Sequence, residues 1–398
     1  MHKTLHYKNV LKLFCLTIIL CFSYVSSAHA EKKDIFDRFK KSMPEIPLIE
    51  QGEFIAQTRP VKDVPYNQDA LGYTLRIPKD WLDTESKSSS NFMLSEKLFL
   101  ELNSFYGPAS PFGRSRIEIQ ALSLESNLTI EQWYLAYILE AGMTPEGFVT
   151  HSPDKVESLM VVMEKDYSYY LRTLVVRNEN KIIMLRYYVP VGFMQEEAAM
   201  QASVVNSFGI LKEIPKSPMK SEIYRFLDVA ELRYGTQWKV FAAPMRSVDY
   251  LDATLVNLEN GGSGKVSTNS PSQGKIDVSL ILISDEKTLV EEIMEYKKKM
   301  ELNGVLVGEK YIGYGEMVYN EKMDFGISEV YKGIDSRNNQ SEYEFWFTVL
   351  IGGNYYYFMM LLTPSRNDNF AVWASNVQNF RFMIENFKPM SGAYLERN

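Results

Sequence analysis

Histidine and cysteine, the side chains most often used for nucleophilic and metal chemistry, are scarce in this chain. Only one of its 4 histidines, His151, lies beyond residue 30, and both cysteines, Cys15 and Cys21, precede that position. A catalytic triad or a histidine-ligated metal in the rest of the chain would therefore depend on His151 alone. Because the turn signal SPD follows at 152–154, we interpret His151 as an imidazole in a solvated loop.

Two other stretches contain residue types that chemistry could use. Residues 261–265, GGSGK, suggest a phosphate-binding loop, but they lack its spacing and no helix start follows, so we interpret them as a linker. Glu291, Glu292 and Glu295 could pair as general acid and base, but together with the lysines at 297–299 they have the spacing of a solvated helix face. Hydrolase, metalloprotease and dinucleotide-binding motifs do not occur in the sequence. We therefore predict a protein that is not an enzyme, with no catalytic, cofactor-binding or metal-binding residues; an enzyme would need carboxylate or tyrosine chemistry that no motif marks.

Two aromatic runs, YSYY at 167–170 and YYYF at 355–358, offer binding rather than reaction. Successive residues of a strand face opposite sides of the sheet, so some of these tyrosines face away from the core. Amphipathic aromatic side chains exposed on a sheet are favoured at protein interfaces. The alternative is that the rings pack across strands and fill the core. The candidate partner-contact residues in these runs are Tyr167, Tyr169, Tyr355 and Tyr357.

The segment 31–66 has a different composition and supplies two more candidate contact residues. Phe36 and Phe39 lie in a short amphipathic stretch, and four prolines follow, which predict an extended path with little regular structure. We hypothesise that this N-terminal arm docks on a partner or on the second half of the chain. A disordered tether is the alternative.

Residues 1–30 have the pattern of a secretory signal peptide. Lys3, Lys8 and Lys12 lie near the start, the apolar stretch covers 11–25, and Ala28-His29-Ala30 then provides a cleavage site. The apolar stretch is short for a membrane span, which needs about 20 residues. We expect cleavage after Ala30, export to a bacterial periplasm, and no transmembrane segment afterwards. A lipoprotein anchored through Cys21 is the alternative, although the bulky Leu20 precedes that cysteine.

Removal of the signal peptide would change both the charge and the thiol content. The net charge would fall from −7 to −10, and the remaining 368 residues would contain no cysteine. An acidic surface repels phosphate groups, so we expect no nucleic acid as partner. Without disulfides, the fold must be stabilised by its core, which suits domains of about 150 residues or more.

The second half of the chain repeats the first half in the same order. The matched pairs, separated by 157, 159, 174 and 172 residues, are Trp81 and Trp238, Ile117 and Ile276, Asn180 and Asn354, and Phe208 and Phe380. Two prolines follow the first copy at Pro215 and Pro218, which marks a linker. We therefore divide the mature chain into the arm (31–66), a first domain (67–211), a linker (212–220) and a second domain (221–390).

Each copy has the same predicted elements. A helix begins at a capping box, Thr129 in the first copy and Thr288 in the second, where a Gln or Glu follows three residues later. Long strands rich in β-branched and aromatic residues follow, and a helix ends each copy. We predict an α+β fold: two tandem repeats, each an antiparallel sheet packed with helices on one face.

This arrangement resembles the PsbP-like family, which includes the DcrB-type periplasmic lipoproteins. The sequence IPKDW at 77–81 matches the opening motif of that family, and NSF at 206–208 matches its close. The second copy departs from both motifs, with Gly235 and Asn379 in place of the proline and the serine. The resemblance implies an α/β/α sandwich and an accessory, assembly or partner-binding role, and it implies no catalytic residues.

These observations predict a non-enzymatic periplasmic protein that acts through protein–protein contacts. The partner would be periplasmic or membrane-associated, as in an accessory component of an envelope-spanning assembly such as a secretion system. The alternative is a periplasmic small-molecule or lipid-binding module. In that case, a pocket between sheet and helices would be lined by the many methionine and aromatic residues.

Overall fold

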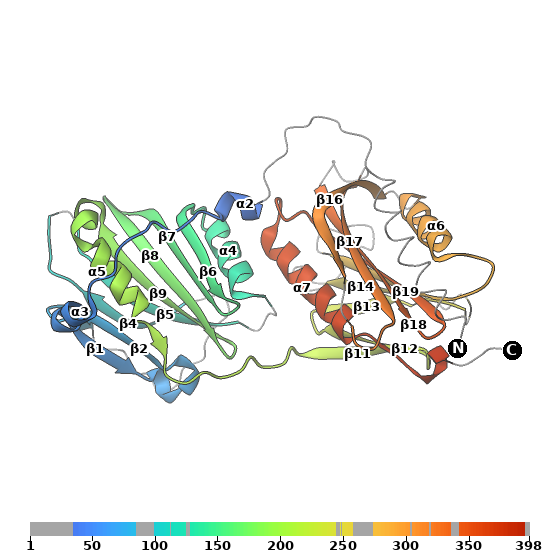
Figure 1. Cartoon of the computed structure of the whole chain (residues 1–398), viewed down its shortest axis with the longest axis horizontal. Coiled ribbons are helices and arrows are strands. Elements are labelled where there is room, and N and C mark those ends of the chain that lie inside the picture. Colours follow the sequence, from blue (N-terminus) through green and yellow to red (C-terminus); the bar gives the residue numbers. More distant parts are fainter. Residues whose placement is uncertain are drawn as a thin grey trace. The chain divides into compact units, whose positions relative to one another are not determined.

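The computed structural model of the chain contains two large sheets, each with its own helices (Figure 1). The described residues are 35–84, 99–111, 113–124, 128–243, 247, 249–257, 274–302, 305–317, 320–335 and 342–394. The expected signal peptide and the glycine-rich stretch at 261–265 lie outside them. Among the helices in these ranges, none is long and apolar enough to cross a membrane.

The first large sheet is antiparallel and seven-stranded, with the order β3-β4-β5-β9-β8-β7-β6. Its strands are β3 (Leu82–Thr84), β4 (Leu100–Tyr106), β5 (Arg116–Ser123), β6 (Pro145–Ser152), β7 (Lys155–Glu164), β8 (Tyr167–Asn178) and β9 (Lys181–Pro190). Strand β9 therefore pairs with the much earlier β5, and this long-range pair closes the middle of the sheet.

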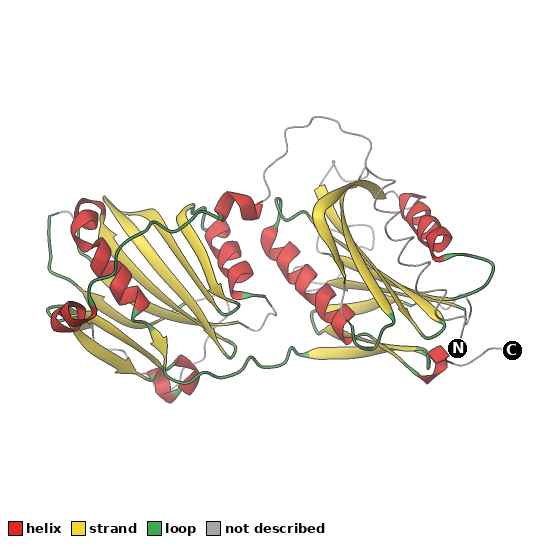
Figure 2. Cartoon of the chain, in the orientation of Figure 1, coloured by secondary structure: helices red, strands yellow, loops and turns green. Residues whose placement is uncertain are grey.

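The second large sheet repeats this topology strand for strand, in the order β13-β14-β15-β19-β18-β17-β16 (Figure 2). Its strands are β13 (Trp238–Ala242), β14 (Tyr250–Asn257), β15 (Lys275–Leu282), β16 (Val305–Met317), β17 (Phe325–Asp335), β18 (Glu342–Gly352) and β19 (Tyr355–Pro364). The predicted α+β fold with two tandem repeats is therefore confirmed.

A small three-stranded sheet accompanies each large one. The first has the order β1-β2-β10 and the second β11-β12-β20. The strands are β1 (Thr58–Asp63), β2 (Tyr73–Pro78), β10 (Gly209–Ile210), β11 (Ser221–Phe226), β12 (Ala230–Gly235) and β20 (Lys388–Pro389). Short 3₁₀ turns complete the chain: η1 (Pro65–Asn67), η2 (Asp69–Leu71), η3 (Val191–Phe193) and η5 (Ser391–Tyr394).

The expectation of little regular structure in the N-terminal arm is wrong for residues 51–63. Helix α3 (Gln51–Gln57) begins there because the Glu50 carboxylate accepts from two of its first amides, and its Phe54 packs into the first core. Strand β1 follows and pairs with β2 along its whole length. Pro60 is tolerated because β1 is an edge strand, where a missing amide hydrogen needs no partner.

Two hydrogen bonds join residues before α3 to the first half of the chain. The Lys41 carbonyl accepts from the Phe148 amide of β6 at 2.8 Å. Further on, the Ile49 amide donates to the Ser203 hydroxyl at 2.9 Å. These two bonds attach the arm to the first half at Lys41 and at Ile49.

Helices cover both faces of the first sheet, whereas the sequence pattern predicted one covered face. Leu174 packs in the same core as Val205 of α5 (Met194–Asn206). The preceding residue, Thr173, faces the other side, because strand residues alternate. Its cross-strand partner Ser158 bonds there to the Tyr134 hydroxyl of α4 (Ile130–Glu140) at 2.6 Å. The resemblance to an α/β/α sandwich therefore describes the layers better than the pattern did.

The second sheet is covered in the same way. On one face, Tyr296 of α6 (Leu289–Leu302) packs against Phe347 and Phe358. On the other face, Trp346 lies beside Trp373 of α7 (Phe370–Asn386). Both predicted capping boxes that begin the first helix of each copy are present, at Thr129 and Thr288.

A buried ion pair lies beneath α7. Glu344 and Arg366 have no exposed side-chain surface, and the Glu344 carboxylate accepts from Nε and Nη2 of Arg366 at 2.6 and 2.8 Å. The indole Nε1 atoms of Trp346 and Trp373 donate to the same carboxylate at 3.3 and 2.7 Å. This carboxylate is therefore saturated with donors, as a buried charge must be.

Candidate functional site

The structure buries most of the aromatic residues that the sequence marked as candidate partner contacts. Tyr355 and Tyr357 lie on β19, every residue of which is buried, and the Tyr357 hydroxyl donates to the Gly352 carbonyl at 3.0 Å. Tyr169 and Phe39 are also buried. The prediction is wrong for these four side chains. The three tyrosines are buried because central strands of a sheet covered on both faces expose neither set of alternate residues, whereas Phe39 is buried at the end of helix α2.

The remaining two candidates differ from each other. Phe36 is partly buried in the short helix α2 (Ile35–Phe39). Tyr167 is 41% exposed and stands at the tip of the hairpin that joins β7 to β8. Only Tyr167 of the six is therefore placed where a large part of its ring can contact another molecule.

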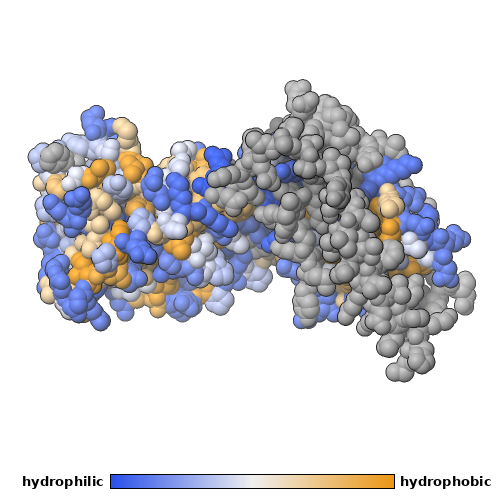
Figure 3. Space-filling model, turned by 45° about the horizontal axis from the view of Figure 1, so that its top comes forward, coloured by the Kyte–Doolittle hydropathy of each residue, from blue (hydrophilic) through white to orange (hydrophobic). Residues whose placement is uncertain are grey.

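The hairpin tip, residues 161–170, carries two more exposed apolar side chains. Val161 is 47% exposed and Met163 is 77% exposed, the latter the highest value among the large hydrophobic residues of the described chain. Strand β6 pairs with β7 only as far as Met160, so β7 continues beyond its neighbour. The turn is tight, with Lys165 at φ 53°. The hairpin tip therefore presents apolar side chains where β7 extends past the end of β6. Figure 3 shows hydrophobic and hydrophilic residues interspersed on the coloured part of the surface.

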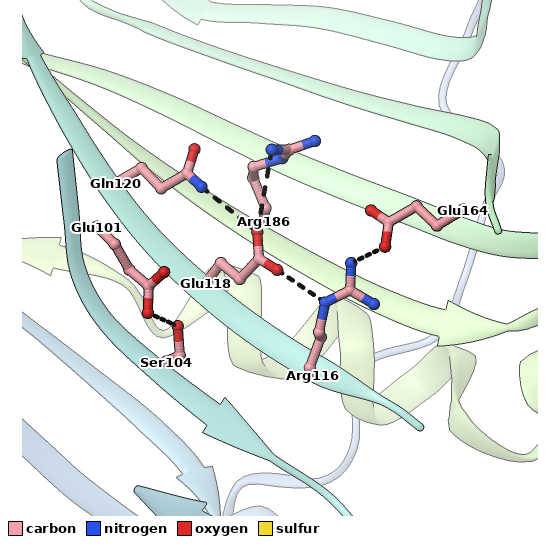
Figure 4. Close-up of polar contacts among 7 residues, drawn as sticks. All are labelled: Glu101, Ser104, Arg116, Glu118, Gln120, Glu164 and Arg186. Carbon is pink, nitrogen blue, oxygen red and sulfur yellow. Dashed lines mark hydrogen bonds and ion pairs between the residues drawn. The ribbon is translucent and has the colours of Figure 1, made fainter. Parts of the chain in front are cut away.

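A polar cluster attaches the hairpin tip to the rest of the sheet (Figure 4). The Arg116 guanidinium on β5 binds Glu118 at 2.7 Å and reaches across to Glu164 on β7 at 2.6 Å. Arg186 on β9 lies 3.9 Å from the second oxygen of Glu118. Only 12% of the Arg116 side chain and 17% of the Glu118 side chain are exposed, so their contact is shielded from solvent, whereas 43% of the Glu164 side chain is exposed.

Aromatic rings complete the surroundings of Arg116. Its guanidinium lies 3.6 Å from the centre of the Tyr188 ring and 5.1 Å from that of Tyr169. Burial lowers the pKa of the guanidinium, but the hydrogen bond to Glu118 and the charges of Glu118 and Glu164 more than offset burial, and the pKa is raised. For the Tyr188 hydroxyl, burial itself raises the pKa. Arg116 therefore stays charged and Tyr188 neutral in any physiological medium.

The second sheet has a counterpart to one part of this cluster. Lys275 and Asp277, which occupy the positions of Arg116 and Glu118, bind each other at 2.8 Å. In the first sheet, Arg116 in addition binds Glu164 of β7. The pair along the strand is therefore a feature that both sheets share.

The loop between β4 and β5, residues 107–115, rests on the same hairpin. At Gly113, with φ 107°, a β-carbon would lie 2.8 Å from the Tyr169 hydroxyl oxygen, so glycine is required there. The Ser110 hydroxyl donates to the Gly113 carbonyl at 2.6 Å, and the Gly107 amide donates to the Ser115 carbonyl at 2.9 Å. These bonds hold the loop in one conformation beside the hairpin tip.

His151 lies in strand β6, not in the solvated loop that the sequence suggested. Its Nε2 is 2.7 Å from a Glu157 oxygen, and the other Glu157 oxygen accepts from Arg172 Nε at 2.6 Å. The nearly buried carboxylate thus has two basic neighbours, and His151 is 40% exposed at the rim. This arrangement explains the histidine as a partner of a buried acid. Among the described residues there is no cluster of three His, Cys, Asp or Glu able to hold a metal.

Comparison with known proteins gave matches in structure only. No family model and no curated protein matches the chain. Cyanobacterial PsbP from Synechocystis is 14% identical and is matched over 39% of this chain and 94% of its own, with a TM-score of 0.29. The Ran-binding protein Mog1p from Saccharomyces cerevisiae is 10% identical and is matched over 45% and 100%, with a TM-score of 0.31.

A third structure is matched over both halves of this chain. The immunity protein TplEi of the type VI secretion system of Pseudomonas aeruginosa is 12% identical and is matched over 80% of this chain and 94% of its own, with a TM-score of 0.19. The chain therefore resembles PsbP and Mog1p in structure over less than half of its length, in line with the resemblance that its motifs suggested.

Proposed function

We propose that this protein acts by binding another protein through the hairpin tip of its first sheet. The observation that carries this proposal is the exposure of Val161 and Met163 on one face of the hairpin tip, which polar and aromatic contacts hold in place. Tyr167, which pairs across the strands with Glu164, lies on the opposite face of the hairpin tip. Exposed apolar side chains that are grouped and rimmed by charge mark interaction sites, whereas single ones do not.

The fixed conformation of the hairpin tip favours binding energetically. A surface that is already ordered loses little conformational entropy when a partner binds. Burying a side chain such as Met163, which is largely exposed in the free protein, yields about 1.5–3 kcal/mol. Two such residues on one face of a rigid support, Val161 and Met163, can form the centre of a protein interface.

The structure does not favour the alternative of a small-molecule or lipid site. The methionine and aromatic residues that suggested an apolar pocket include Met184, Met359 and Phe358, and all three are fully buried within the packed sheets. They fill the core between sheet and helices.

Export belongs to the same proposal. A protein cleaved after Ala30 would meet its partner in the periplasm, and the partner would be periplasmic or membrane-associated. Mass determination of the protein purified from a periplasmic fraction tests this part. A chain that begins at Glu31 supports export, and a chain that retains residues 1–30 contradicts it.

Site-specific photocrosslinking tests the binding surface. A photoreactive amino acid is placed at Met163 and, as a matched control, at Met294, a 63% exposed methionine on α6. The proposal expects a reproducible crosslinked species in living cells from position 163 and none from position 294. The same species from both positions, or none from position 163, would contradict it.

A further inference from the structure

Strand β7 runs past the end of its neighbour β6, and this leaves part of its edge open. The pairing of β6 with β7 ends where Pro145 lies opposite Met160, whereas β7 pairs with β8 as far as Glu164. Strand β6 is the last strand of the sheet on this side. Within the described chain, no strand therefore lies beside β7 from Val161 to Glu164.

The backbone groups of two residues in this stretch point out of the sheet. On β6, the Phe148 amide donates away from β7, to the Lys41 carbonyl at 2.8 Å, so its cross-strand partner Ser158 directs its backbone groups toward β8. The register of β7 against β8 is unbroken, so every second residue after Ser158 also faces β8. Val161 and Met163 fall between these residues and direct their amides and carbonyls outward.

These outward groups match the needs of a neighbouring strand. Among the described residues, none outside the β7–β8 ladder makes a backbone hydrogen bond to Val161 or Met163. Their amides and carbonyls are the donors and acceptors that a strand uses when it adds to an edge. The side chains of the same two residues, 47% and 77% exposed, flank the edge on one face. Backbone and side chains together fit an occupant in extended conformation.

Contacts on the other face hold the open edge in its strand conformation. Glu164, the last residue of β7, is bound by Arg116 at 2.6 Å. Val162 pairs across the strands with Tyr169, which is buried and lies 5.1 Å from the Arg116 guanidinium. An incoming strand would therefore meet an ordered edge and lose less conformational entropy on binding.

An extended segment of this chain already occupies the adjoining edge. The N-terminal arm bonds to β6 through the Lys41 carbonyl and the Phe148 amide. At Gly147, a β-carbon would lie 3.0 Å from Met43 Cα and 3.1 Å from Pro44 Cδ, so the backbone of the arm passes close to β6. This side of the first sheet thus binds extended chain at β6, while β7 beyond it stays open.

We propose that the hairpin tip binds its partner by strand addition: an extended segment of the partner protein pairs with β7 at Val161 and Met163, in line with β6. Backbone hydrogen bonds supply affinity in this mode, and alternate side chains supply specificity. The segment is apolar at the positions that face Val161 and Met163, because cross-strand neighbours on one face pack together. This inference rests on the proposed function, since it specifies how the same partner is bound.

Hydrogen–deuterium exchange resolved to single amides tests the geometry in the free full chain. The amides of Val161 and Met163 should exchange at least about tenfold faster than that of Val162, which bonds to β8. They should also exchange faster than the amide of Leu159, which has the same direction but pairs with Gly147. Equally slow exchange at all these positions would mean that the edge is covered and would overturn the inference.

A phage-displayed library of random linear peptides, selected on the full chain, is the probe for binding. Selected peptides should have apolar residues at alternate positions and should protect the amides of Val161 and Met163 from exchange. Peptides that leave these amides unprotected would count against strand addition. Protection that appears in the concentrated chain alone would identify a second copy as the occupant and would also overturn the inference.

Two variants separate the backbone from the side chain. Met163→Ala keeps the outward amide and Met163→Pro removes it, and proline is tolerated at such an edge position. The selected peptides should bind Met163→Pro about threefold to tenfold more weakly than Met163→Ala, which is the factor of one net hydrogen bond. An amide-to-ester replacement at Met163 removes the amide hydrogen alone and gives the same comparison if the proline variant does not fold. Equal binding with and without the amide would refute strand addition.

The outcome is separable from the proposed function. If position 163 crosslinks to a partner in cells but removal of its amide changes nothing, the hairpin surface stands and strand addition falls. If the peptides pair with the edge and no crosslink forms in cells, the edge accepts strands and the proposed function falls.

Discussion

Removal of Arg116 should loosen the hairpin tip without touching any exposed contact residue. Arg116→Met deletes the bonds to Glu118 at 2.7 Å and to Glu164 at 2.6 Å and keeps an apolar side chain against Tyr188. The bond to Glu118 is largely shielded from solvent, and a charged hydrogen bond of this kind contributes about 1.5–3 kcal/mol. Because 43% of the Glu164 side chain is exposed, the second bond is discounted to below about 1 kcal/mol.

Only the bond to Glu164 reaches the hairpin tip, so the expected local destabilisation is below about 1 kcal/mol, which corresponds to at most about fivefold faster amide exchange in a segment that opens locally. Hydrogen–deuterium exchange read by mass spectrometry should show this increase in peptides that cover 161–170. Partner capture through the hairpin tip should weaken at the same time, because the partner must then order the segment.

The second sheet provides a matched control. Lys275→Met removes the equivalent pair with Asp277 and should leave exchange at 161–170 unchanged. If Arg116→Met does not accelerate exchange in that segment, or if Lys275→Met accelerates it equally, the polar cluster does not fix the hairpin and the reasoning is wrong.

Three further outcomes are expected. Met163→Lys should weaken partner binding by about tenfold to a hundredfold, from the burial of one large apolar side chain, whereas Met294→Lys should not, as measured by biolayer interferometry once the crosslinked partner is identified. Arg366→Met should destabilise the second half by about 3–5 kcal/mol in urea unfolding followed by tryptophan fluorescence, because it leaves the buried Glu344 charge unpaired; the double variant with Glu344→Gln should recover part of this loss, and strict additivity would count against the pair. Burial raises the pKa of the Glu197 carboxyl in the folded protein, so the native state holds this proton more tightly than the unfolded state does. The free energy of unfolding should therefore fall as pH rises from the ordinary carboxyl range through the raised pKa. Glu197→Gln should remove that fall, and parallel pH–stability curves of the two proteins would refute it.

The sequence correctly predicted the parts of the fold that depend on local patterns of residues. The capping boxes at Thr129 and Thr288 depend on residues three apart, and both are formed. The repeat could be detected because matched tryptophans and phenylalanines recur in order, and the strand orders of the two sheets agree. These features need no knowledge of which strand lies beside which.

The candidate site depends on relations that local patterns do not contain. Arg116 and Glu164 are 48 residues apart, and they meet because the sheet places β5 and β7 in one layer, with β9 and β8 between them. Tyr355 and Tyr357 have the same alternation as exposed strand residues and are buried because β19 is central. The exposure of Met163 follows from the length of β6, which ends its pairing at Met160. A run of β-branched and apolar residues that is longer than its neighbour strand is the signal that could have indicated it.

The unequal lengths of β6 and β7 also affect how the free protein is protected against aggregation with other copies of itself. Phe148 directs its amide outward to Lys41, so its partner Ser158 directs its backbone toward β8, and the alternation turns the backbone groups of Val161 and Met163 outward. Within the described chain these groups have no strand beside them, and an open apolar edge invites strand pairing between molecules. The charged residues at 164–166, EKD, follow immediately and act as gatekeepers against such pairing. Neutral substitutions at these three positions would therefore be expected to increase aggregation while leaving the core unchanged.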